Sequence, residues 1–484
     1  MPGNDLRTIS GIHAAYAAGS TSPTGVVAEY LKVAKANANN SYLTVCEDRA
    51  MAQARAAEQE LARDRSILQA KPLLGIPVGI KDVLTTEGIR TTCASKMLAN
   101  YIPPYTATAV ARLEAAGAVV VGKTNMDEFA MGGSNENSAF GPVKHPTHPD
   151  RVPGGSSGGS AVAVAERSAV ATLGTDTGGS VRLPASYCGV VGLKPSYGRV
   201  SRYGMVAFAS SLDQIGPLAN SVEDCARILE AMAGHDPLDT TSSPRPIEKW
   251  SQLLTKGSLK GLRIGMPAEF FTDGITPDVR ASVDAALKWY ESQGAKLVPV
   301  SIPRAKVAVS VYYVVAVSEA SSNLARFDGI RFGARPGDLG SGDLSLGRFY
   351  EHVRANFGTE VKRRILLGTF ALSSGYYDAY YRRACQVRRL LKQDFDDAFK
   401  VCDLVVSPTS PITAFKAGEK SADPLKMYLV DVFTISANLA SLPAISIPVG
   451  RDGAGLPIGL QLMAPGFQET RLLQTAAAWE RAHA

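Results

Sequence analysis

Short runs of apolar, often β-branched residues alternate with helical segments from Leu73 to the end of the chain. The first three runs lie at residues 78–80, 118–121 and 170–173. Later runs lie at residues 262–265, 297–300, 404–407 and 444–447, and a closing helix is expected at residues 469–483. Continuous apolar runs are typical of strands buried on both faces of a sheet, and their alternation with helices predicts an α/β fold.

The first 70 residues have a different pattern. Segments 23–38 and 46–68 have apolar residues spaced near 3.6, which predicts helices with Ser22 and Asp48 as candidate caps. Residues 236–257 are richer in Pro, Thr and Ser, which favours a surface excursion over a linker because strand and helix patterns resume after it. We therefore expect one sheet that spans both halves of the chain, with two separate domains as the alternative.

Composition excludes several classes of protein. The chain has 484 residues, 45% of them hydrophobic and 20% charged, which suits a large globular enzyme and not a disordered or fibrous protein. The six cysteines form no C-x-x-C pair, so neither a disulfide framework nor a zinc knuckle is expected. The N-terminus has no basic-then-apolar signal, and no uninterrupted apolar stretch approaches the roughly 18 residues of a membrane span, so we expect a cytoplasmic protein.

The net charge of +6 is weak evidence for nucleic-acid binding. Basic residues are spread along the chain, apart from short clusters at residues 362–364 and 382–383. A solvated helix face explains each cluster, since a nucleic-acid-binding protein usually concentrates its charge on one surface. Direct binding of nucleic acid by this chain is not predicted.

Lys81 is the candidate base. It ends the apolar run 73–81, in which a strand period of two places Ile76, Val78 and Ile80 on one face. Lys81 shares the other face with two glycines, which leave that face open. A lysine shielded from water there would have a lowered pKa, and its neutral amine would accept a proton. The alternative from this strand alone is an ion pair between Lys81 and the adjacent Asp82.

Two serines lie in glycine-rich turns, Ser156 in residues 154–159 (GGSSGG) and Ser180 in residues 174–180 (GTDTGGS). Glycine lets the backbone approach a substrate closely and point several N–H groups at one place, where an oxyanion would be stabilised. A helix at residues 160–168 follows the first turn, so its positive end is expected near Ser156 and Ser157. The lysine and the two serines together predict a proton relay for the cleavage of amides.

Three other motifs have weaker support. Residues 117–124 (GAVVVGKT) match a phosphate-binding loop, but the four intervening residues form a predicted strand. Residues 154–158 match the G-x-S-x-G turn of Ser/His/Asp hydrolases, but the prolines of residues 145–153 exclude the strand that must precede it. His145 and His148 lie in the same proline-rich loop with no third metal ligand signalled nearby, so a structural loop is favoured.

The segment from residue 154 to residue 195 resembles the hallmark of the amidase signature family, including residues 182–185 (RLPA) and 192–195 (GLKP). The resemblance implies an α/β fold with a large central mixed sheet flanked by helices on both faces. It implies a single amidase domain over residues 1–484, with a helical region at 1–70, the signature core at 71–235 and the remaining sheet with substrate-binding residues at 236–484.

The resemblance also implies roles for individual residues. Lys81 would be the base, Ser156 the bridging serine that is often held by a cis peptide, and Ser180 the nucleophile. The backbone amides of Thr177, Gly178 and Gly179 would form the oxyanion hole.

Further segments resemble those members of the family that hydrolyse glutamine within tRNA-dependent amidotransferases: residues 197–204, 207–214, 318–324 and 368–377. In these proteins an arginine holds the carboxylate of glutamine and an aspartate holds its amino group, with a tyrosine nearby. The matching positions are Arg364, Asp431 and Tyr312, with Arg363 and Tyr313 as adjacent candidates. An arginine fork suits a carboxylate and an aspartate suits an ammonium group, so the two charges would select an amino acid.

The resemblance implies a complex. Ammonia from glutamine would pass to a B subunit that converts Glu-tRNA(Gln) to Gln-tRNA(Gln), a small C subunit would be the third partner, and ATP and Mg would be used by the B subunit. No cofactor or metal is expected in this chain. The alternatives are a free-standing amidase of the same family that acts on small amides, and a catalytically silent scaffold.

Overall fold

The computed structural model describes residues 6–335, 345–420 and 427–483. Within these ranges, eleven strands form one sheet in the order β1-β3-β2-β4-β6-β5-β10-β11-β9-β7-β8. Strands β2, β3 and β4 are mutually parallel, as are β7, β8 and β9, whereas the strands between these two groups pair antiparallel. The sheet is therefore mixed, which confirms the predicted fold class. It combines strands from both halves of the chain, while the single-domain organisation stays a prediction.

The strands have the following bounds: β1 Tyr42–Val45, β2 Pro77–Lys81, β3 Val119–Thr124, β4 Ala171–Asp176, β5 Val191–Lys194, β6 Gln214–Ala219, β7 Arg263–Pro267, β8 Lys296–Val300, β9 Leu404–Pro408, β10 Ala444–Arg451 and β11 Pro457–Met463. The helices have the following bounds: α1 Ile9–Ala18, α2 Pro23–Ala36, α3 Glu47–Arg63, α4 Ile67–Ala70, α5 Thr108–Ala115, α6 Gly158–Ala165, α7 Arg182–Cys188, α8 Val222–Met232, α9 Trp250–Leu253, α10 Pro277–Ser292, α11 Ala308–Asn323, α12 Leu346–Ala355, α13 Thr359–Leu372, α14 Arg383–Ala398, α16 Ile435–Leu439 and α17 Glu469–His483.

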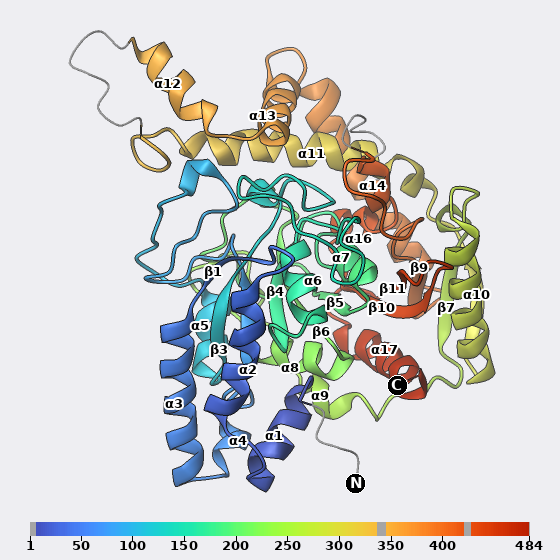
Figure 1. Cartoon of the computed structure of the whole chain (residues 1–484). Helices are drawn as coiled ribbons and strands as arrows, with labels where there is room; N and C mark the ends of the chain where they lie inside the picture. The colour runs from blue at the N-terminus through green and yellow to red at the C-terminus, as the bar shows by residue number, and fades with distance from the viewer. Residues whose placement is uncertain (1–5, 336–344, 421–426, 484) are drawn as a thin grey trace.

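Helices cover the sheet on both faces. Helices α2, α3, α6 and α7 pack against strands of the sheet, as do α8, α10 and α17. Figure 1 shows α2 and α3 beside β1 and β3, with α1 and α4 below them, and α11, α12 and α13 across the top of the molecule, beyond the sheet. Successive residues of β3 pack on opposite faces of the sheet. Val119 and Val121 belong to an apolar cluster with α2 and α3, whereas Val120 belongs to the largest apolar cluster. Both faces are thus buried, which explains why the strands are apolar throughout.

Most of the expected elements are present. All seven predicted strands exist, and the closing helix has the predicted bounds. Ser22 caps α2 by accepting a hydrogen bond from Gly25 N. The predicted cap Asp48 is wrong: the N-cap position of α3 is Cys46, and Asp48 lies in the first turn, where its charge interacts favourably with the helix dipole. The helix predicted at 160–168 begins earlier, at Gly158, and ends at Ala165.

One helical stretch, Pro303–Arg326, is long and apolar enough to be a candidate membrane span by length and composition. Half of its most apolar window is buried inside the protein. Its central helix α11 packs against α13, α14 and α16. These contacts are those of a core helix, so its apolar character is explained by packing within the chain.

Candidate active site

Lys81 ends β2, on the face of the sheet that α6 covers. Its ammonium nitrogen Nζ lies 2.8 Å from Ser156 Oγ, 2.7 Å from Ser157 Oγ and 2.9 Å from Thr175 Oγ1, and the whole side chain is buried. A Cβ at position 79 would lie 2.9 Å from Thr172, so glycine at that position permits the close packing beside the lysine. Lys81 therefore lies on the strand face that the period of two predicts, and its side chain contacts the serine turn.

Burial lowers the pKa of Lys81 to about 7, although the negative charges of Asp127, Asp176 and Asp213 oppose the shift. A pKa near 7 means that a large fraction of the side chain is a neutral amine at neutral pH. Such an amine can accept a proton from the hydroxyl 2.8 Å away. The alternative reading of Lys81, an ion pair with Asp82, is wrong, because Asp82 pairs instead with buried Lys123 at 3.1 Å.

The serine turn is held by its neighbours. The Gly155–Ser156 peptide bond is cis. Asp127 N donates to Ser156 O at 3.2 Å, and Ser157 N donates to Ser180 O at 3.2 Å. Ser157 is also the N-cap residue of α6, so the two serines lie at the positive end of that helix. These bonds place the turn between the lysine and the backbone of Ser180.

Ser180 follows β4 through a turn of buried residues, Thr177, Gly178 and Gly179, and is itself 7% exposed. Within the described residues, the N–H groups of positions 177 to 180 make no hydrogen bond to the protein. Consecutive buried N–H groups without partners are rare in folded proteins unless a ligand uses them. The turn can therefore present several donors to one oxyanion.

Two buried carboxylates hold the base of this turn. Asp213 accepts a hydrogen bond from Thr177 Oγ1 at 2.7 Å and from the backbone of Phe208 and Ala209. Asp176 pairs with Arg182 at 2.9 Å. Burial alone would raise the pKa of Asp176, but the charge and hydrogen bond of Arg182, together with Lys194 and Asn438, lower it to about 2. The backbone before Ser180 is thus fixed on both sides.

Tyr312 and Asp431 approach the same turn from α11 and from the segment before α16. A Cβ at position 178 would lie 2.8 Å from the Tyr312 hydroxyl, and a Cβ at position 179 would lie 2.9 Å from Asp431 Oδ1. Within the described residues, Asp431 Oδ1 is buried and has no hydrogen-bond partner. Burial raises the pKa of Asp431 well above its ordinary value. A buried carboxyl without a partner is suited to receive a cationic group from a ligand.

Arg364 lies on α13, where its Nε donates to Glu360 Oε1 at 2.8 Å. Its guanidinium carbon lies 5.4 to 5.6 Å from the ring centres of Phe208, Tyr313 and Tyr428. Since the bond to Glu360 uses Nε, the two Nη groups are left to form a fork toward a carboxylate. The side chain is 4% exposed, compared with 39% for Arg363, which also pairs with Glu360.

A cavity of about 190 Å³ adjoins these residues. It is lined by Gly132, Ser134, Glu136, Asn137, Thr359, Glu360, Arg363, Arg364, Lys420, Met427 and Tyr428. Position 133 of the same loop adjoins Asp431, because a Cβ there would lie 3.4 Å from Asp431 Oδ2. The predicted arginine thus lines the cavity, and the predicted aspartate lies behind its glycine-rich wall, next to the turn of Ser180.

The second candidate tyrosine has a different place. Tyr313 stacks on Tyr428 with ring centres 3.9 Å apart and adjoins Arg364, whereas Tyr312 adjoins Gly178. The two adjacent tyrosines therefore lie in different places, Tyr313 beside Arg364 and Tyr312 beside the turn that precedes Ser180.

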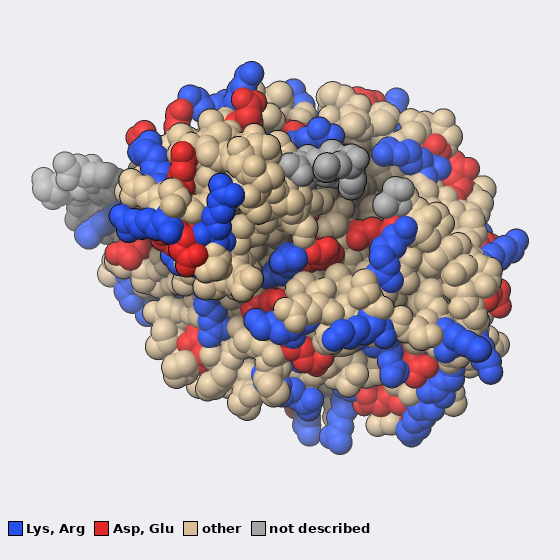
Figure 2. Space-filling view, turned by 90° about the horizontal axis from the view of Figure 1, so that it is seen from below, with Lys and Arg blue, Asp and Glu red and all other residues tan. Residues whose placement is uncertain are grey.

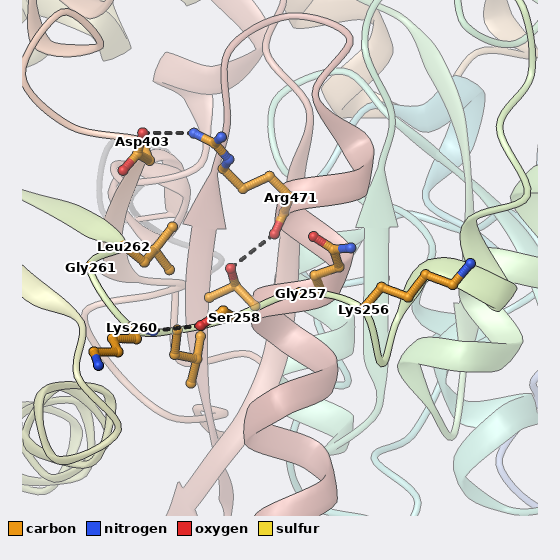
Figure 3. A pocket seen from close by; sticks show the side chains of 11 residues that line it. Lys256, Gly257, Ser258, Lys260, Gly261, Leu262, Asp403 and Arg471 are labelled. Atoms are coloured by element: carbon orange, nitrogen blue, oxygen red, sulfur yellow. Dashed lines mark hydrogen bonds and ion pairs between the residues drawn. The ribbon is translucent and has the colours of Figure 1, made fainter.

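Another cavity lies elsewhere and contains none of the predicted site residues. It is lined by residues 256–262 and by Asp403, Arg471, Gln474 and Thr475, as Figure 3 shows. The guanidinium of Arg471 points to Asp403 and lies 2.7 Å from its Oδ1, so its charge is already paired. The volume of this second cavity, about 370 Å³, exceeds that of the cavity beside Arg364, but the second cavity is not lined by a nucleophile beside a base.

Two of the three motifs with weaker support have structural roles. Residues 119–124 of the phosphate-loop match form β3, in which Lys123 is buried and paired with Asp82. His145 Nε2 lies 2.8 Å from Tyr187 O, and its ring packs edge-on against His148 at 5.5 Å. Within the described residues, no group of three or more His, Cys, Asp or Glu side chains is arranged to hold a metal ion.

Comparison with known proteins decides the family. The model of the amidase family matches residues 25–473, which is most of the chain. The chain belongs to the amidase family. This amidase is 54% identical over 446 residues to the A subunit of glutamyl-tRNA(Gln) amidotransferase from Geobacter metallireducens, an alignment that covers 92% of this chain and 90% of the relative. It is 52% identical to the protein of the same name from Burkholderia thailandensis, with 98% and 97% covered.

Solved structures agree with this assignment. The amidase superposes on the A subunit of glutamyl-tRNA(Gln) amidotransferase from Thermotoga maritima with a TM-score of 0.72 and 46% identity, over 84% of this chain and 83% of that one. It superposes on the native peptide amidase of Stenotrophomonas maltophilia with a TM-score of 0.81 and 29% identity, over 98% and 96%. The family fold thus extends over nearly the whole chain.

No role was assigned from the sequence to several residues that the structure places at the site. Ser157 shares the lysine with Ser156, Asp213 holds Thr177, and Glu360 holds Arg364. Asp213 is part of a segment that resembles the glutamine-hydrolysing members of the family, but its role depends on a contact across 36 positions of sequence. Only the Glu360–Arg364 spacing of four residues on one helix is a local signal.

Proposed function

We propose that this amidase hydrolyses glutamine to glutamate and ammonia and supplies the ammonia to a tRNA-dependent amidotransferase. The observation that carries the proposal is the bond of 2.8 Å between the buried Lys81 amine and Ser156, in a turn bonded to the backbone of Ser180. The named relatives, which are A subunits of glutamyl-tRNA(Gln) amidotransferases, support the same substrate.

The chemistry begins with a proton relay. Neutral Lys81 takes the hydroxyl proton of Ser156 as Ser156 takes that of Ser180. Ser180 Oγ bonds to the side-chain amide carbon of glutamine, and the carbonyl oxygen becomes an oxyanion that receives the N–H groups of Thr177, Gly178 and Gly179. The proton returns to the leaving nitrogen, the carbon–nitrogen bond breaks and ammonia leaves. Water then hydrolyses the glutamyl ester and restores Ser180.

Charge gives specificity for glutamine. Arg364 would bind the α-carboxylate, Asp431 the α-ammonium group, and Tyr312 would border the reacting amide. The unpaired state of Asp431 Oδ1 and the free fork of Arg364 support these roles. A simple amide would leave both charged groups without a partner, which costs binding energy.

The proposed partners are a B subunit, which would use ATP and Mg to activate Glu-tRNA(Gln), together with a small C subunit in a cytoplasmic complex. An exposed apolar surface on α13 and the residues after it supports the proposal that this chain binds a partner. We name this surface the α13 surface. It consists of Leu366, Leu367, Phe370, Tyr376, Tyr377 and Tyr380, each 42 to 71% exposed. Clustered exposed apolar side chains of this kind are typical of interaction sites.

Covalent trapping tests the proposal. A diazoketone analogue of glutamine should label Ser180, as located by mass spectrometry of the digested protein, and Ser180→Ala should remove both labelling and ammonia release. Excess glutamine should protect against labelling. Labelling at another residue, or ammonia release that persists in Ser180→Ala, would contradict the nucleophile.

A panel of amides separates this function from that of a free-standing amidase. The proposal predicts that glutamine is preferred over 4-aminobutanamide, which lacks the α-carboxylate, and over simple acyl amides. Equal activity on all of them, unchanged by candidate B and C subunits, would favour the free-standing amidase. A protein that releases no ammonia from any amide would favour a silent scaffold.

A further inference from the structure

Thr434 makes a hydrogen bond that the proposed reaction has not yet used. Its hydroxyl donates to the carbonyl oxygen of Gly178 at 2.7 Å, and the side chain is fully buried. The hydroxyl also lies 3.0 Å from Asp431 O, an oxygen that accepts the backbone N–H of Thr434 as well. The partners Thr434 and Gly178 are 256 positions apart in sequence, so the bond joins two distant segments at the nucleophile turn.

The bond fixes the orientation of one peptide group. The peptide between Gly178 and Gly179 is trans, since the one cis bond among the described residues is at Gly155–Ser156. In a trans peptide the carbonyl oxygen and the N–H point in opposite directions. Holding the Gly178 oxygen toward Thr434 therefore turns the Gly179 N–H away from Thr434, and that N–H has no hydrogen-bond partner in the described part of the protein.

Glycine at position 179 makes the contact possible. Its φ of 148° is in the region that side chains rarely adopt, and a Cβ there would lie 2.3 Å from Thr434 Oγ1. Without an external donor to the Gly178 carbonyl oxygen, two adjacent glycines would leave the peptide free to rotate. A buried hydroxyl that binds the carbonyl removes this freedom before the substrate arrives, which is how preorganised donors stabilise an oxyanion.

We propose that Thr434 is a positioning residue that orients the Gly178–Gly179 peptide so that the Gly179 N–H donates to the oxyanion. The inference rests on the proposed function, because it assumes that an oxyanion forms at Ser180. Asp431 lies in the same segment as Thr434, three residues earlier, but it would contact the ground-state substrate. Asp431 and Thr434 should therefore affect different kinetic constants. Loss of Asp431 should raise KM for glutamine, whereas loss of the Thr434 hydroxyl should lower kcat.

The test compares Thr434→Val, which keeps the shape but removes the hydroxyl, with Thr434→Ser, which keeps the hydroxyl. Two ligands report on different states of the site. The aldehyde analogue of glutamine forms a tetrahedral adduct: Ser180 Oγ bonds to the aldehyde carbon, and the serine proton ends on the former carbonyl oxygen. Glutamate, the product, binds without an adduct.

For Thr434→Val we expect kcat for glutamine to fall about 10- to 100-fold, with KM changed less than about threefold. A Gly179 N–H that points away from the oxyanion should lower kcat by at most as much as the removal of one oxyanion-hole donor does. Affinity for the aldehyde should fall by a similar factor, and affinity for glutamate should remain. Thr434→Ser should behave like the unmodified protein in all three measurements.

Two results would overturn the inference: Thr434→Val with unchanged kcat, or an unchanged ratio of aldehyde to glutamate affinity, whether neither affinity changes or both fall equally. An equal fall of both affinities, also expected if the variant folds poorly, would show a purely structural role, and Thr434→Ala measured in the same way would check it. Failure of the proposed function can be distinguished from failure of this inference, because in the former case the unmodified protein would release no ammonia from glutamine.

Discussion

Lys81 is subject to two opposing effects. Burial favours its neutral form, while Asp127, Asp176 and Asp213 favour its charged form. The carboxylates weaken the effect of burial without cancelling it, so the pKa stays near 7. A lysine with a pKa much lower would be a poor proton acceptor, and one with a pKa of 10.5 would be almost entirely protonated at neutral pH.

This balance predicts the pH dependence of the reaction. Since the neutral amine is the proposed proton acceptor, kcat/KM for glutamine should rise as the pH increases through about 7 and level off above it. Burial also raises the pKa of Glu128 to about 7, so Glu128→Gln is the matched control and should leave the midpoint unchanged. A rate independent of pH between about 5.5 and 8.5, or a midpoint that moves in Glu128→Gln, would contradict the assignment to Lys81.

The two adjacent arginines of α13 allow a second comparison. Arg364→Met should raise KM for glutamine about 10- to 100-fold, because a charge-assisted bond to a carboxylate contributes roughly 1.5–3 kcal/mol. The same variant should process 4-aminobutanamide as the unmodified protein does. Arg363→Met should change KM less than about threefold, since its side chain is 39% exposed. Equal effects of the two variants on steady-state KM would show that the wrong arginine has been chosen.

The proposed catalytic residues could be identified from the sequence because each has a local signal. Strand parity oriented Lys81, and the glycines marked the turns of Ser156 and Ser180. Thr434 and Asp213 could not be found in this way. Their bonds to Gly178 and Thr177 join segments 256 and 36 positions apart, and only the folded sheet brings these segments together.

The strands show a similar division. Strands with continuous β-branched residues, such as β3, were predicted, whereas β6 and β11 were missed because Pro and Gly interrupt their patterns. In β6 the interruption is tolerated: Pro217 pairs with Leu173 of β4, while β5 pairs with β6 only at Leu218 and Ala219, beyond the proline. The strand β1 was missed because it has four residues at the edge of the sheet.

A buried ion pair joins β3 to the residue after β2. Lys123 and Asp82 are both fully buried and 3.1 Å apart. Lys123→Met would leave the Asp82 charge buried without its partner and should destabilise the protein by roughly 3–5 kcal/mol. The midpoint of urea unfolding measures this. Lys35→Met, which breaks the exposed pair with Glu47, is the control and should cost less than about 1 kcal/mol. Similar midpoints for the two variants would show that the buried pair does not stabilise this edge of the sheet.

Charged side chains and exposed apolar side chains both contribute to the surface of the molecule. Figure 2 shows lysines and arginines interspersed with acidic side chains on the face it presents, so no single-sign stripe marks that face. The apolar side chains of the α13 surface lie instead on and after the helix that carries Arg364. That helix has its arginine toward the cavity and Leu366, Leu367 and Phe370 toward solvent. The α13 surface is therefore on the same helix as the arginine that lines the cavity, and the proposed partner would bind there.

The proposed complex can be tested at this surface. Leu366→Arg together with Phe370→Glu should reduce the recovery of co-expressed B and C subunits at least about tenfold, because charges replace two apolar side chains that the partner would bury. Glutamine hydrolysis by the separate chain should not change, since neither side chain faces the cavity. Leu238→Arg, at a position 62% exposed in another part of the molecule, is the matched control and should leave recovery unaffected. Full recovery of the complex with the double variant would place the partner on a different surface, and an equal loss with Leu238→Arg would show only a general effect of added charge.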